Sequence, residues 1–148
     1  METTCQVKTR ILRETADRIE SEYFRWGSFP YCVIGHTAQV ALGVRGVDIE
    51  YSINQNLETP IPSWTYATRY DQIRVKVSLV NEIIVGLHSL GFTDTEITKA
   101  EFGSLAKYSA FINEGLAPEK GKEEIALRLR QWADELDQLT LSQSSPTD

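Results

Sequence analysis

The sequence predicts a mainly helical fold, a single small domain of five or six helices, possessing a short β-hairpin only in one alternative interpretation. Two observations support this prediction. Apolar residues recur at spacings of three and four along much of the chain, most clearly over residues 125–139, which is the period of an amphipathic helix. The chain has 148 residues, of which 41% are hydrophobic and 24% charged, and such values are typical of one globular domain.

The composition also limits the expected partners. The 21 acidic and 15 basic residues give a formal charge of −6, and Lys and Arg do not gather on any predicted face. We therefore expect no nucleic-acid partner, because binding a phosphate backbone requires a basic stripe. No run approaches the roughly 20 apolar residues of a membrane helix, and the first residues lack the features of a signal peptide. We accordingly expect no membrane partner and a cytoplasmic location, with Cys5 and Cys32 reduced.

The first two helices are predicted on either side of an aromatic stretch. The first covers about residues 6–23, and its apolar stripe contains Leu12, Ala16, Ile19 and Tyr23. Gly27 and Pro30 interrupt it. The second helix is expected to begin at Tyr31 or Cys32 and to end at Leu42, because Gly43 is a favourable residue for a left-handed helix end.

The middle of the chain is open to two interpretations. Residues 47–53 alternate between apolar and polar side chains, as in a strand, but they can also form a short helix. Residues 73–79 present the same choice, so a hairpin of these two segments is the alternative, and it would need a helix to pack against. Between them, residues 60–64 are too rich in proline for a regular element, and we expect a loop held by Trp64.

The second half of the chain is helical by the same criteria. An apolar stripe over residues 80–90 predicts a helix that stops at Gly91. Thr93 and Glu96 have the spacing of a capping box, which predicts a new short helix. Phe92 and Ile97 would form its hydrophobic staple.

Two further helices complete the prediction. One is expected over residues 105–112, burying Leu105, Tyr108 and Phe111 or Ile112. The last begins near Pro118 or Lys122 and ends at Leu139, and its stripe consists of Ile125, Leu129, Trp132, Leu136 and Leu139. Such a stripe packs in a bundle or against a partner helix. The predicted domain is residues 1–139, followed by a disordered tail over residues 140–148, which contains little to bury.

The aromatic stretch carries a recognisable pattern: Arg25-Trp26, five residues, Cys32, two residues, Gly35-His36, one residue and Ala38-Gln39. This pattern resembles the motif of an uncharacterised family of small bacterial proteins, and the resemblance covers most of the chain except residues 54–80. Similar proteins are sometimes labelled as a subunit of a sodium-translocating NADH-quinone reductase. That label would imply an iron–sulfur cluster with four cysteine ligands, whereas this chain has two cysteines. We therefore expect no cofactor.

The chain departs from the family pattern at several polar positions. Ile34 stands where the family has its second motif cysteine, and Ser28 replaces a histidine before the motif. Asn81-Glu82 corresponds to an Asp-His pair of the family, and Lys99 to another histidine. If those family residues bind a metal or take part in chemistry, the resemblance implies that only Cys32 and His36 are retained here.

Cys32 and His36 give the sharpest chemical hypotheses. Residues four apart share a helix face, and a thiol in the first turn of a helix is favoured as a thiolate. The pair could therefore act as nucleophile and base of a hydrolase or transferase. The same two residues could be metal ligands, although completing a zinc site would need His88, Cys5 or acids such as Glu50 and Glu82. A packed structural thiol is the competing interpretation, because free cysteine is among the most buried residue types.

Aromatic residues of the same stretch suggest a binding surface. Candidate binding residues are Arg25, Trp26, Tyr31, Gln39 and Trp64, which could line a pocket for a small molecule or a peptide. The same aromatics could instead wedge a loop against the helices. We expect a non-catalytic interaction or regulatory module with a protein partner or as a homodimer, using the last helix stripe or the aromatic stretch. The alternative is an enzyme or a metal-binding protein based on Cys32 and His36.

Overall fold

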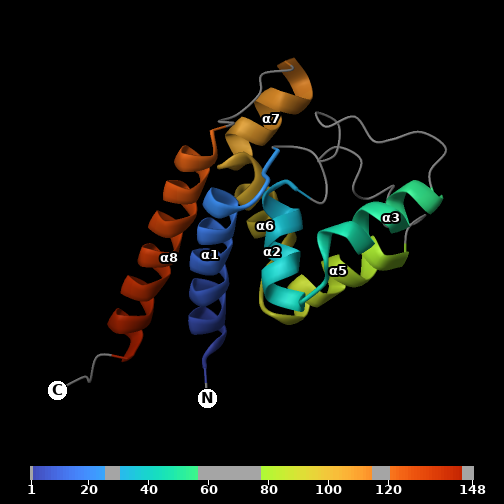
Figure 1. Cartoon of the computed structure of the whole chain (residues 1–148). Coiled ribbons are helices and arrows are strands. Elements are labelled where there is room, and N and C mark those ends of the chain that lie inside the picture. Colours follow the sequence, from blue (N-terminus) through green and yellow to red (C-terminus); the bar gives the residue numbers. More distant parts are fainter. Residues whose placement is uncertain (1, 26–30, 57–77, 115–120, 145–148) are drawn as a thin grey trace.

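The computed structural model describes residues 2–25, 31–56, 78–114 and 121–144, and these residues form helices and the turns between them, with no strand among them (Figure 1). The helices are α1 (Thr4–Ser21), α2 (Val33–Leu42), α3 (Gly46–Asn56), α5 (Ser78–Ser89), α6 (Asp94–Phe102), α7 (Leu105–Glu114) and α8 (Lys122–Ser144). The predicted mainly helical fold is confirmed. None of the helices in the described ranges is long and apolar enough to cross a membrane.

The hairpin alternative is wrong for its first segment. Residues 47–53 lie inside α3, and Ile49 of that helix is fully buried. A strand would place Val47, Ile49 and Tyr51 on one face. In the helix Ile49 points into the core, while Val47 and Tyr51 face solvent. Of the second segment, residues 73–77 lie outside the described residues, and residues 78 and 79 begin α5.

Helices α1 and α8 form the longest pairing of the fold. They lie side by side and run in opposite directions, so that the start of α1 and the end of α8 lie at the same end of the molecule (Figure 1). The stripe of α8 is buried at Ile125, Leu129, Trp132 and Leu136. Arg13 of α1 bonds to Asp134 at 2.8 Å and Asp137 at 2.6 Å across the pair. These four residues of the predicted stripe are therefore used inside the chain.

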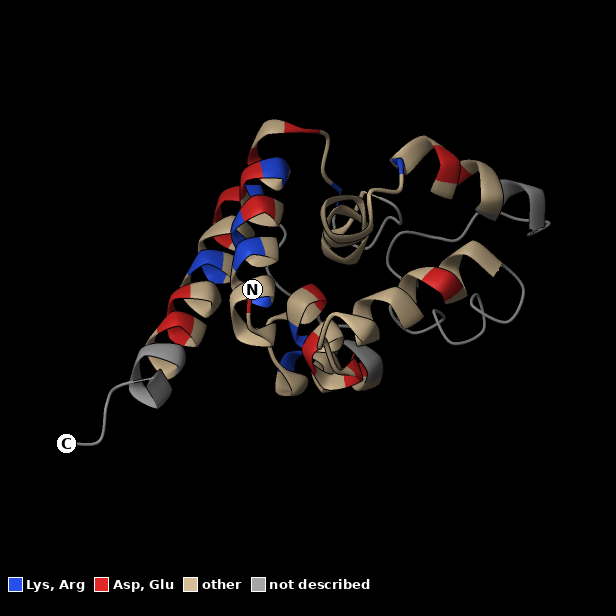
Figure 2. Cartoon of the chain, turned by 90° about the horizontal axis from the view of Figure 1, so that it is seen from below, with Lys and Arg blue, Asp and Glu red and all other residues tan. Residues whose placement is uncertain are grey.

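Helix α2 occupies the centre of the molecule. It contacts α1, α3, α5 and α6, and its ribbon contains no Lys, Arg, Asp or Glu, whereas α1 and α8 carry both signs along their length (Figure 2). Every residue from Cys32 to Ala38 is buried. A helix without charged residues that is buried on all sides must be surrounded by other elements, and this explains why the other helices are arranged around α2.

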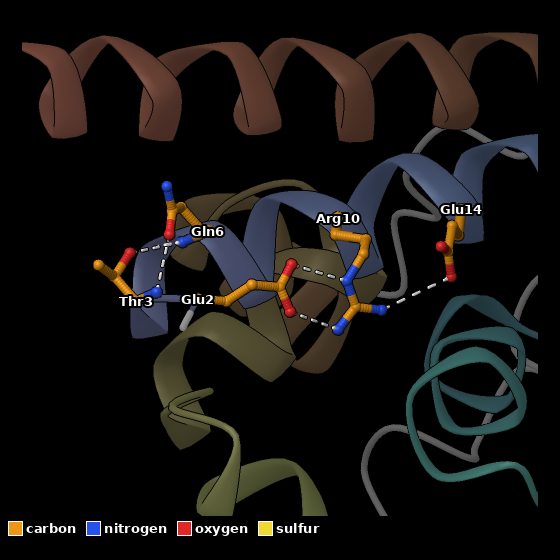
Figure 3. Close-up of polar contacts among 5 residues, drawn as sticks. All are labelled: Glu2, Thr3, Gln6, Arg10 and Glu14. Atoms are coloured by element: carbon orange, nitrogen blue, oxygen red, sulfur yellow. Dashed lines mark hydrogen bonds and ion pairs between the residues drawn. The ribbon is translucent and has the colours of Figure 1, made fainter.

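The predicted helix ends are confirmed where local side chains define them. Thr93 and Glu96 form the capping box of α6, and Gly43 and Gly91 have φ angles of +70° and +101°. A second capping box, which we did not predict, begins α1: the Thr3 hydroxyl accepts from the Gln6 amide, and the Gln6 side chain accepts from the Thr3 amide (Figure 3). These local bonds satisfy amides that a helix end leaves without partners.

Some predicted details differ. Leu105 and Leu139, both expected inside, are 54% and 55% exposed, and Tyr23 lies beyond the end of α1. The side chains of Phe111 and Ile112 lie outside the described residues, while Tyr108 packs against the core. Helix α8 continues to Ser144 and so includes the first part of the tail predicted over residues 140–148. Residues 145–148 lie outside the described residues.

Candidate functional site

The first turn of α2 is closed by two side chains. Cys32 is the N-cap residue, and its sulfur accepts a hydrogen bond from the Gly35 amide at 3.4 Å. Glu101 of α6 reaches the same turn, where its Oε1 accepts from the Ile34 amide at 3.2 Å. Glu101 is 1% exposed and Cys32 is fully buried. The positive end of a helix favours a carboxylate at this position, so Glu101 ties α6 to α2.

Burial determines the protonation of both groups. It raises the pKa of the Cys32 thiol well above the ordinary value, and the neighbouring Glu101 carboxylate raises it further. Burial also raises the pKa of Glu101, against the opposing effects of hydrogen bonds from Ile34, the Cys32 thiol and Val33. The thiolate that the catalytic hypothesis requires is therefore disfavoured at Cys32, because the helix end is closed to water and already occupied by an acid.

His36 has a separate role. Its Nε2 lies 2.8 Å from the carbonyl oxygen of Tyr23, and a carbonyl can only accept, so Nε2 carries the proton. The side chain is 1% exposed, Nδ1 has no hydrogen-bond partner among the described residues, and its ring lies against that of Phe24. Burial lowers the pKa of His36, which favours the neutral ring. His36 thus holds the chain that leaves α1 against α2.

The structure does not join Cys32 and His36 into a reactive pair. Cys32 bonds within the first turn and to Glu101, while His36 bonds to Tyr23. Among the described residues, no three His, Cys, Asp or Glu side chains are grouped as metal ligands. His88 pairs with Asp94 on the surface at 2.7 Å, and Cys5 donates to the Leu136 carbonyl.

A pocket at the corner between α2 and α3 brings together two of the predicted binding residues. We call it the corner pocket; it is lined by Arg18 of α1, Tyr31, Gln39 and residues 43–47, and its volume is about 480 Å³. The Gln39 side-chain oxygen accepts from Arg18 Nη2 at 2.7 Å and from the Gly46 amide at 3.1 Å. One amide group therefore fixes both a guanidinium and the first residue of α3.

Gly46 forms one wall of this pocket, close to Gln39. A Cβ atom added to Gly46 would lie 3.2 Å from both Oε1 and Nε2 of Gln39. That separation is shorter than ordinary van der Waals contact, so a side chain here would make Gln39 shift by a few tenths of an ångström. The absence of a side chain at Gly46 thus lets the turn approach α2 closely enough for the hydrogen bond to form.

The charges of the corner pocket are partly compensated at its rim. Arg45 makes two bonds to the Asp48 carboxylate, at 3.0 and 3.1 Å, in an exposed pair. The Tyr31 hydroxyl donates to Glu50 at 2.9 Å, and the ring of Tyr31 meets that of Tyr23 edge to face. Arg18 is half-buried and forms no ion pair with a carboxylate of the described residues; its guanidinium donates instead to the neutral Gln39.

The other predicted binding residues lie elsewhere. Arg25 is exposed, and its amide bonds to the Tyr31 carbonyl at 2.9 Å, which positions Tyr31 at the pocket. Trp26 and Trp64 lie outside the described residues. Arg18, Arg45 and Glu101 were not among the residues predicted from the sequence. Glu101 had a usable signal, because it follows Ile97 by four residues and so lies on the apolar face of α6; Arg18 had none, since it belongs to a charged helix face.

Comparisons of the chain with protein-family models, with curated proteins and with solved structures gave no match. The class that the described residues define is a small all-helical domain with a polar corner pocket and a buried acid–thiol helix cap.

Proposed function

We propose that this protein is a non-catalytic binding module, and that the corner pocket with the adjoining face of α3 is its contact surface. The observation that carries the proposal is the pocket itself, because it joins Tyr31 and Gln39 to a half-buried arginine. Beside it, Val47 and Tyr51 lie one helical turn apart and are 59% and 66% exposed. Exposed aromatic and apolar side chains next to fixed polar groups are typical of interaction sites.

The roles of the motif residues support a structural interpretation of the motif. Cys32 caps α2, His36 anchors the segment before it, and Gln39 braces the turn after it. Membership of the small bacterial family that the motif resembles is part of this proposal, as is a cytoplasmic location, which agrees with two unpaired cysteines. Cys32, His36 and Gln39 thus each have a task in positioning helices that requires no reaction.

The environment of Cys32 argues against the enzyme alternative. A nucleophilic cysteine needs access and a stabilised thiolate, whereas this thiol is fully buried beside an acid that raises its pKa. We expect the Cys32 thiol of a Cys5→Ser variant to remain unreactive toward a chromogenic disulfide reagent in native buffer and to react at once in denaturant. Rapid native reaction that is faster at pH 7 than that of a free thiol would refute the non-catalytic proposal.

Self-association is the second part of the proposal. It concerns the α3 face, because four of the five residues in the α8 stripe, Ile125, Leu129, Trp132 and Leu136, are buried within the chain. Light scattering coupled to gel filtration measures it directly. If the protein is a dimer through this face, Val47→Asp should give monomers, whereas Leu127→Asp, at an equally exposed position of α8, should leave the dimer intact. A monomer at all concentrations would remove the homodimer from the proposal and leave a different protein as the partner.

A further inference from the structure

We propose that the corner pocket binds a single oxyanion group, a carboxylate or a phosphate, with Arg18 as its principal contact. The inference deepens the proposed function and rests on it. Arg18 is half-buried, faces the pocket and forms no ion pair with a carboxylate of the described residues. Removing a guanidinium from water without an opposite charge is unfavourable, and an anion in the pocket would supply that charge.

The pocket holds Arg18 in a fixed orientation. Its Nη2 is bound to Gln39, which is in turn bound to the Gly46 amide. A guanidinium that is already ordered loses less side-chain freedom when it binds, and its planar fork matches the two oxygens of a carboxylate or phosphate. Gln39 is therefore a positioning residue, which acts on the ligand through Arg18.

The surrounding charges permit an anion to enter. The residues that line the pocket include two arginines and no acid. Asp48 and Glu50 lie at the rim and are bonded to Arg45 and Tyr31. Because the Arg45 pair is exposed and surface pairs contribute little, Arg45 can exchange Asp48 for the incoming anion. The pocket volume of about 480 Å³ accommodates a group larger than a single ion, within the usual range for ligand sites.

The test is a titration of the ¹⁵N-labelled full chain with sodium phosphate, sodium acetate and sodium chloride at constant ionic strength. We expect saturable shifts of the Gly46 amide and of the Arg18 Nε signal with phosphate and acetate, and none with chloride. Arg18→Gln should weaken the binding about tenfold or more, the usual effect of losing a charge-assisted hydrogen bond. Arg10→Gln, which removes an equal charge from an exposed site on the same helix, should not weaken it.

A second variant separates positioning from charge. Gly46→Ala keeps every charge but displaces Gln39, so it should weaken phosphate binding severalfold while the protein stays folded. Shifts that do not saturate, that chloride reproduces, or that persist in Arg18→Gln would overturn the inference. None of these results touches the reactivity of Cys32, so the failure of the oxyanion site and the failure of the non-catalytic proposal are distinguishable.

The source of the oxyanion follows from one more comparison. A blocked tripeptide of glutamate is titrated beside phosphate under the same conditions. Tighter binding of the tripeptide would identify an acidic segment of a partner protein, which could also contact Val47 and Tyr51. Tighter binding of phosphate would identify a phosphorylated small molecule.

Discussion

Glu101 offers the sharpest test of how this fold is held together, because it is a fully enclosed acid that joins two helices. Its Oε1 accepts from the Ile34 amide, and its carboxylate also contacts the Cys32 thiol. Glu101→Ala removes the acceptor and leaves buried donors without partners, each costing about 1–3 kcal/mol. The lost volume adds to this, so we expect the free energy of unfolding to fall by about 2–5 kcal/mol.

Glu101→Gln isolates the charge. Burial raises the pKa of Glu101 above the ordinary value of 4.5, so as pH rises the unfolded chain loses this proton before the folded chain does. This acid therefore disfavours the folded state increasingly as pH rises from about 4.5 through its folded pKa. Glutamine keeps an acceptor for Ile34 and cannot ionise. The stability of Glu101→Gln relative to the wild type should thus increase with pH, by about 1.4 kcal/mol for each tenfold change in proton affinity.

The assay is urea unfolding followed by circular dichroism at a series of pH values from about 4 to 8. Glu82→Gln, at an exposed position of α5, is the matched control and should follow the wild type at every pH. A stability difference between Glu101→Gln and the wild type that stays constant or falls with rising pH would refute the reasoning. So would a Glu101→Ala protein as stable as the wild type.

Three further predictions concern other contacts. Burial lowers the pKa of His36 from 6.5, so the unfolded chain gains this proton first and stability falls as pH drops below about 6.5; His36→Gln should reduce that acid-dependent loss. Gly91→Ala should lower the free energy of unfolding by about 2 kcal/mol or more, because φ is +101° and the new Cβ would lie 2.3 Å from the Thr4 side chain. Gly43→Ala should lower it by only about 1 kcal/mol, because φ is +70° and the new Cβ would meet no other atom. Arg13→Gln breaks two exposed ion pairs of the α1–α8 pairing and should cost less than about 1 kcal/mol, and this cost should shrink in high salt.

All three are measured by chemical unfolding, and each has an outcome that contradicts it. For His36, the contrary result is an unchanged acid dependence in the variant. For the two glycines, the contrary result is a larger loss of stability in Gly43→Ala than in Gly91→Ala. For Arg13, a loss of several kcal/mol that salt does not affect would mean that the pair is buried in solution.

Helix ends and apolar stripes were predictable because short-range geometry determines them. The Thr93 box, the stop at Gly91 and the inward residues of α8 depend only on neighbours within about one helical turn. The α3 segment was ambiguous for a related reason: its alternation fits both periods over so few residues, and only packing of Ile49 into the core decides between them.

The candidate site required contacts that are distant along the chain. Cys32 was correctly placed at the start of α2, but its pKa depends on burial and on Glu101, which lies far along the chain, and the sign of that effect cannot be read from local sequence. Arg18 and Gln39 are 21 residues apart, and each alone resembles an ordinary polar helical residue. Their pairing across α1 and α2 is what makes a pocket.

The sequence by itself determined that this chain forms amphipathic helices and where most of them begin and end, because backbone hydrogen bonding and side-chain periodicity are local. Only the tertiary structure decided which polar groups are enclosed together. The free energy of a buried charge depends on partners brought from other helices, so the protonated thiol beside Glu101 and the braced guanidinium of Arg18 appear only once those helices are packed.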